Sequence, residues 1–285
     1  MPPSRYLVCA PTAGLLIVGW LIVFLVWPEG PGEHLAIGLL LGTLFGHTTF
    51  AAAWTAFGPG PLILRLPLSI AVVATVLVAF SLNVRRHNQP NFGIEIVLAL
   101  CLLGQWVLVQ LPLWGLGFLY GIHLRHHSSE SHPTLSGRRQ FGIRQLLVAT
   151  TIVAVILGLG RVLIAGRAMT TPDTDIVIFA FLGGAAVVMS LPLLLAALVP
   201  RYAVQAVIGV ALLIGVATLF ELPLLQSLPN AGGPQTIDLI WINACTSAWI
   251  LAFVVSARLC GYGLNVPVAG TKGVDKPAPP NLTDV

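Results

Sequence analysis

Histidine is the residue type with the clearest potential for chemistry in this chain, and four of the seven histidines lie close together. His123, His126 and His127 form an H-x-x-H-H string, and His132 follows five residues after it. Imidazole binds iron and zinc, and its charge changes near neutral pH. On a helix, the first three rings would share one face. The string therefore suggests a metal site, a pH-sensing site or, as the simplest interpretation, a solvated loop beside a membrane.

The H-x-x-H-H string resembles one of the histidine boxes of membrane fatty-acid desaturases and hydroxylases. In that family several boxes together hold two irons, so the resemblance implies a metal-dependent membrane enzyme. The resemblance covers five residues of this chain, and the remaining histidines, His34, His47 and His87, form no second box. A di-iron centre would lack most of its ligands. We therefore expect no cofactor and favour a protein that is not an enzyme.

Three other polar side chains, His47, Gln105 and Gln110, lie deep within apolar stretches. Polar groups inside a membrane are costly, so their presence is informative. His47 and Gln105 lie at similar depths, and a His–Gln pair near the middle of the membrane would hold two helices together. Alternatively, these three residues would line the binding site of a small-solute or proton-coupled transporter.

Charged residues also lie inside the outer thirds of apolar stretches, at Arg161, Glu221 and Asp238. An ion pair between Arg161 and one of the acids would neutralise the most costly charge. We interpret these residues as a structural ion pair.

A stripe of small residues, Gly38, Gly42 and Gly46, precedes His47 at intervals of four. Glycines at this spacing lie on one face of a helix and allow another backbone to approach closely. The stripe therefore predicts helix packing, either within one chain or between two copies in a homo-oligomer.

The composition indicates that lipid surrounds the helices that carry these residues. Charged residues make up 8% of the chain, against roughly 25% in a soluble domain, and apolar residues reach 56%. A soluble protein of 285 residues needs more charges than this to cover its surface. Apolar runs of about 20 residues match a hydrocarbon core of about 30 Å. The small net charge of +4 is scattered, which excludes a nucleic-acid-binding surface.

We predict an all-α, polytopic integral membrane helix bundle with about eight transmembrane helices in two four-helix halves. The first half covers residues 1–122, with helices at about 6–27, 35–57, 62–84 and 94–122. A central cytoplasmic loop rich in His and Arg covers 123–145. The second half, 146–262, has helices at about 146–165, 176–199, 203–222 and 237–259, and a disordered cytoplasmic tail covers 263–285.

The distribution of basic residues predicts the orientation in the membrane. With a cytoplasmic N-terminus, ten of the fourteen basic residues fall in cytoplasmic segments. The other four, Arg85, Arg86, Arg161 and Arg167, fall in the outer half. Cytoplasmic segments of membrane proteins carry an excess of Lys and Arg. We therefore expect the bacterial inner membrane, with both termini in the cytoplasm.

The stretch that leads into the fifth predicted span is amphipathic. Its basic side chains can meet anionic lipid headgroups while its apolar side chains enter the interface, each cation contributing about 1 kcal/mol. The expected anchoring residues are Arg138, Arg139, Phe141, Ile143 and Arg144. The segment from Gln140 to Leu147 resembles a Q-F-[ST]-[IL]-R-x-L-L segment of uncharacterised multi-pass proteins from planctomycete-type bacteria, with Gly142 at the Ser/Thr position. This resemblance implies an inner-membrane protein and brings no catalytic residues.

No phosphate-binding loop, nucleophile elbow or H-E-x-x-H zinc motif is present in the sequence. We therefore predict a multi-pass inner-membrane protein with a non-catalytic role as a structural protein, scaffold or sensor. The first alternative is a transporter with a site near His47 and Gln105. The weaker alternative is a metal-dependent membrane enzyme that uses His123, His126 and His127.

Overall fold

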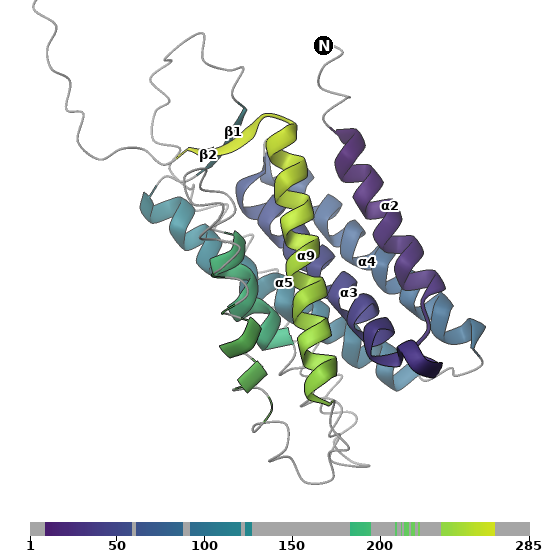
Figure 1. Cartoon of the computed structure of the whole chain (residues 1–285). Coiled ribbons are helices and arrows are strands. Elements are labelled where there is room, and N and C mark those ends of the chain that lie inside the picture. Colours follow the sequence, from purple (N-terminus) through teal and green to yellow (C-terminus); the bar gives the residue numbers. More distant parts are fainter. Residues whose placement is uncertain are drawn as a thin grey trace, which may run out of the picture.

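The computed structural model describes residues 9–58, 61–87, 92–120, 123–126, 183–194 and 235–265, together with a few helical positions between 209 and 222. The long helices run side by side in one bundle (Figure 1). The described residues are mostly helical, as the sequence predicts.

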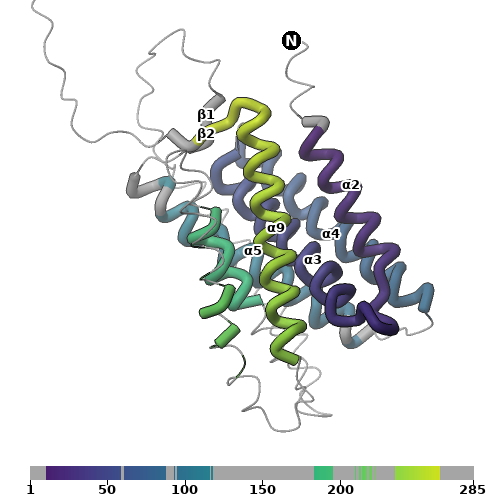
Figure 2. The backbone as a smooth tube through the Cα atoms, in the orientation of Figure 1, coloured from purple at the N-terminus to yellow at the C-terminus, as the bar shows by residue number. Residues whose placement is uncertain are grey.

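The elements follow one another along the chain with short connections in the N-terminal half (Figure 2). In order they are α2 (Cys9–Leu25), the 3-10 helix η1 (Gly30–Gly32), α3 (Glu33–Phe57), α4 (Leu62–Arg86), α5 (Phe92–Tyr120), β1 (His123–His126), α9 (Thr236–Leu259) and β2 (Tyr262–Asn265). A shorter apolar helix, Gly183–Leu194, lies between β1 and α9 in the sequence.

Four of the described helices are long and apolar enough to cross a membrane: Gly30–Phe57, Leu62–Arg86, Glu95–Gly115 and Thr236–Leu259. They correspond to the spans predicted at 35–57, 62–84, 94–122 and 237–259. The span predicted at 6–27 is the shorter helix α2, and that predicted at 176–199 is described only over 183–194. The span at 146–165 and most of that at 203–222 lie outside the described residues. The total of about eight is therefore not confirmed.

The most apolar of these four helices is the least buried one. Ranked from the lowest to the highest mean hydropathy, the order is α3, α9, α5 and α4, and the buried share falls in the same order, from 67% to 61%, 50% and 22%. A soluble bundle would bury its most apolar helix. The inverse order is expected when lipid surrounds the helices, because apolar side chains then face outward and polar or small ones pack inside.

Helix α3 occupies the centre of the bundle and packs against α2, α4, α5 and α9 (Figure 1). Its closest neighbour is α9, which runs parallel to it. Along the glycine stripe, Gly38 faces Trp241, Gly42 faces Cys245, and Gly46 faces Trp249. A Cβ at Gly42 would lie 2.5 Å from the Cβ of Cys245, so only glycine allows this approach. The stripe is therefore used within one chain, and a homo-oligomer contact through it stays a prediction.

A small antiparallel sheet closes the end of the bundle at which α5 and α9 finish (Figure 1). His123 pairs with Asn265 and His126 pairs with Tyr262. The sequence predicted a loop from residue 123 and a disordered tail from residue 263, whereas the structure places 123–126 and 262–265 in two short strands. The pairing joins segments far apart in the sequence, which explains why local patterns did not reveal it.

The C-terminal end of α3 lies at the same end of the bundle, and a side chain from α4 bonds to it. Arg65 donates a hydrogen bond from Nη1 to the Thr55 carbonyl at 2.9 Å. This carbonyl lies in the last turn of α3, where no later helical N–H is available to it. A cation at a helix C-terminus is also favoured by the helix dipole.

Candidate functional site

His47 lies in the middle of α3, and its side chain is completely buried. Its Nδ1 lies 2.8 Å from the Thr43 carbonyl, one helical turn earlier. A carbonyl oxygen only accepts, so Nδ1 carries the proton and donates it. Nε2 is buried and forms no hydrogen bond with any described residue. A neutral imidazole in this tautomer presents Nε2 as an acceptor.

The edge of the His47 ring lies directly against α2. A Cβ built on Gly19 would lie 2.1 Å from Cε1 and 2.3 Å from Nε2 of the ring. No side chain fits at this distance, so glycine at position 19 is required for α2 to lie where it does. His47 therefore packs α3 against α2.

The other sides of the His47 ring are enclosed by aromatic side chains of α9. Trp249 lies 4.8 Å from it between ring centroids, and Phe253 meets it edge-on at 5.1 Å. The indole N–H of Trp249 donates to the Thr43 hydroxyl at 2.8 Å, and that hydroxyl donates to the Leu39 carbonyl. A hydrogen-bonded path thus connects α9 to α3 one turn from the imidazole. These contacts leave the ring little freedom to rotate.

Gln105 is buried on α5 and binds α3, but it does not pair with His47. Its Nε2 donates to the Phe45 carbonyl at 3.1 Å and to the Thr49 hydroxyl at 2.8 Å. Positions two apart on a helix point to different faces. Gln105 therefore lies on one face of α3, whereas His47 faces α2 and α9. The depth that the sequence suggested is right, and the proposed partner is wrong.

Gln110 and Trp106 add buried polar groups to α5. Gln110 is 1% exposed, and neither its Oε1 nor its Nε2 bonds to another residue in the described part of the chain. The same holds for the indole N–H of Trp106. Buried polar atoms without partners cost about 1–3 kcal/mol each. These atoms are the strongest indication of a bound water or polar ligand in the described bundle.

Asp238 lies at the start of α9 and bonds to two described residues. Its Oδ1 lies 2.8 Å from Nδ1 of His34, and its Oδ2 accepts the Gln235 backbone N–H at 2.8 Å. Asp238 thus starts α9 and ties it to the start of α3. Arg161 and Glu221, the other members of the predicted ion pair, lie outside the described residues. The sequence analysis did not identify His34 as a partner of Asp238.

Asn83 is a second buried polar residue that sequence reasoning did not identify. It lies on α4 and donates from Nδ2 to the carbonyls of Val23 and Val26, at 2.8 and 2.6 Å. These carbonyls belong to the last turn of α2 and the residue after it, where helical partners are missing. The signal was available, because an asparagine within an apolar helix needs a partner.

The remaining predicted site residues are only partly described. The backbone of His123 and His126 lies in β1, whereas His127 and His132 lie outside the described residues. So do the expected anchoring residues Arg138, Arg139, Phe141, Ile143 and Arg144. In the described part of the chain, no group of three or more His, Cys, Asp or Glu side chains could hold a metal ion.

Comparison with known proteins adds no assignment, since no family model, curated protein or solved structure matches this chain.

Proposed function

We propose that this chain is a multi-pass inner-membrane protein with a non-catalytic role, as a structural protein, scaffold or sensor. One observation carries the proposal. Where the deep polar side chains of the described helices make hydrogen bonds, they use them to join or brace helices. Gln105 joins α5 to α3, Trp249 joins α9 to α3, and Asn83 joins α4 to α2.

The distribution of charge supports the proposed orientation. In the described part of the chain, the four acidic residues, Glu29, Glu33, Glu95 and Asp238, lie at the end where α3, α5 and α9 begin. Of the five described arginines, Arg85 and Arg86 lie at this same end, whereas Arg65, Arg125 and Arg258 lie at the opposite end, where no acid is described. An excess of cations is typical of the cytoplasmic side. We therefore place β1 and β2 in the cytoplasm.

About eight spans fit the directions of the described helices. α5 finishes at the end of the bundle that holds β1 and β2, whereas α9 begins at the opposite end (Figure 1). Between them the proposal needs an odd number of crossings. The spans predicted at 146–165, 176–199 and 203–222 would make three crossings, which is an odd number.

Labelling of single cysteines tests the orientation. After the native cysteines are replaced, a cysteine introduced at Gly263 should react with an impermeant maleimide only in inside-out vesicles. A cysteine introduced at Glu29 should react only in vesicles of the opposite orientation. Reaction of both positions from one side would refute the proposed topology.

A transporter remains the second candidate, and the amide of Gln110, which bonds to no residue in the described part of the chain, favours it. Purified protein in liposomes loaded with a pH-sensitive dye distinguishes the two roles. For a structural protein, proton flux should equal that of empty liposomes, and Gln105→Leu should change stability alone. Flux that is lost in Gln105→Leu or Gln110→Leu would overturn the structural proposal.

The metal-dependent enzyme is tested by elemental analysis, which should detect stoichiometric iron or zinc if His123 and His126 contribute to a metal site.

A further inference from the structure

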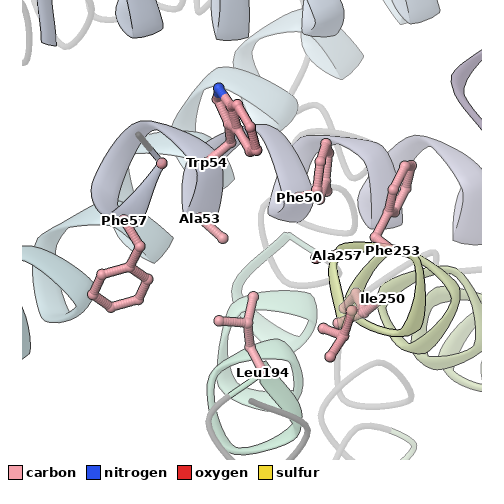
Figure 3. A pocket seen from close by; sticks show the side chains of 10 residues that line it. Phe50, Ala53, Trp54, Phe57, Leu194, Ile250, Phe253 and Ala257 are labelled. Carbon is pink, nitrogen blue, oxygen red and sulfur yellow. The ribbon is translucent and has the colours of Figure 1, made fainter. Parts of the chain in front are cut away.

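An apolar groove lies near the end of the bundle at which α3 and α9 finish (Figure 3). Its volume is about 490 Å³ including its open side. Aromatic side chains from α3 form one wall and side chains from α9 form another, with Leu194 of the shorter helix facing them (Figure 3). Among the described residues that line the groove none is titratable, and Trp54 is the only one whose side chain has a polar atom.

The position and lining of the groove define the class of molecule that it can take. It follows α3 from Phe50 to Phe57, which is about 10 Å along the helix axis at 1.5 Å per residue. This part of α3 is the last two turns of a helix long enough to cross a membrane, so the groove lies at the end of a span. A polar solute would find almost no hydrogen-bonding groups, whereas a hydrocarbon chain needs none.

Cationic groups lie at the end of the bundle beyond the groove. Arg258 directly follows Ala257 and is one helical turn after Val254, and both of these residues line the groove. Its Nη2 is buried and makes no hydrogen bond within the described part of the chain. Arg65 binds the Thr55 carbonyl, which lies between the lining residues Trp54 and Phe57. In the described part of the chain, no acidic residue lies at this end of the bundle.

We propose that the groove binds one acyl chain of a bilayer phospholipid with an anionic headgroup, from the leaflet on the side of β1 and β2. The chain lies against Phe50, Trp54 and Phe253, and the phosphate lies at the end marked by Arg258. A phospholipid is the membrane component that combines a long apolar chain with an anion at one end. Basic residues near a membrane surface attract anionic lipids. The proposal depends on a membrane location but not on the structural role proposed above.

Two matched variants on α9 test the groove. Ala257→Trp places an indole in it, whereas Ala248→Trp makes the same change on an exposed part of the same helix. The proteins are purified in mild detergent, supplied with phosphatidylglycerol, and analysed by native mass spectrometry. The wild type and Ala248→Trp should retain one phospholipid per chain. Ala257→Trp should retain it at least about tenfold less strongly. Ala53→Leu, a smaller change in the opposite wall, serves if Ala257→Trp does not fold.

Two further measurements identify the contacts. Lipids with brominated acyl chains should quench the part of the fluorescence that Trp54→Phe removes. Arg258→Gln should weaken retention of phosphatidylglycerol about fivefold and leave that of phosphatidylcholine unchanged. Equal lipid retention in folded Ala257→Trp and Ala248→Trp would overturn the proposal. It would also fail if brominated lipids left Trp54 unquenched, since a protein segment would then fill the groove.

Discussion

Replacing Gly19 by alanine should push α2 away from the imidazole of His47. The added Cβ would lie 2.1 Å from Cε1 of the ring, far inside van der Waals contact. The ring cannot turn aside easily, because Nδ1 is bonded to the Thr43 carbonyl and Trp249 packs against it. Overpacking of this kind costs about 1–3 kcal/mol. The free energy of unfolding should therefore fall by this amount, less any gain from helix propensity.

The gain from helix propensity is removed by a matched control on the same helix. Gly14 of α2 has nothing within 4 Å of a Cβ, so Gly14→Ala changes only propensity, by about 1 kcal/mol in favour of the helix. The difference between the two variants isolates the clash with His47. At about 2–4 °C for each kcal/mol, the melting temperature of Gly19→Ala should lie about 2–12 °C below that of Gly14→Ala.

The assay is thermal unfolding in lipid nanodiscs, followed by circular dichroism and repeated in a His47→Ala background. Without the imidazole, the difference between the two glycine variants should fall below about 0.5 kcal/mol, the usual limit of additivity. Equal melting temperatures in the wild-type background would refute the contact. A difference that persists without His47 would show that something other than the ring opposes α2.

Three further substitutions test other contacts between helices by the same unfolding measurement. Gly42→Ala should lower the melting temperature relative to Gly104→Ala, because a Cβ at 42 meets α9 at 2.5 Å and one at 104 meets nothing within 4 Å; a reversed order would contradict the α3–α9 packing. Asn83→Ala should cost about 1–3 kcal/mol, because two carbonyls at the end of α2 lose their donor, and an unchanged midpoint would exclude this bond. Asp238→Ala should cost about 1–2 kcal/mol through loss of the helix cap and of the bond to His34, whereas a cost near zero would mean that neither stabilises the bundle.

Local sequence was sufficient to predict where the helices lie. The structure places α3, α4, α5 and α9 within a few residues of four predicted spans. A helix that crosses a membrane must be apolar over about 20 residues, and Gly- and Pro-rich turns such as 58–61 interrupt the pattern. The β1–β2 pair had no such signal, because its strands are short and pair across 136 positions from His126 to Tyr262. A local sequence pattern cannot predict which residues of two such distant strands pair with each other.

By itself, the sequence determined which side chains are costly in a membrane and how deep each one lies. Counting residues along each predicted helix placed His47 and Gln105 at similar levels, and the structure agrees, because Gln105 bonds to α3 at Phe45 and Thr49, on either side of His47. Only the tertiary structure decided their partners, because depth says nothing of the rotation of a helix about its axis or of its neighbours. That rotation directs His47 to Gly19 and Trp249 and turns Gln105 to the other face of α3. The choice of neighbours follows from glycines that let backbones approach, and it emerges only when all the helices pack together.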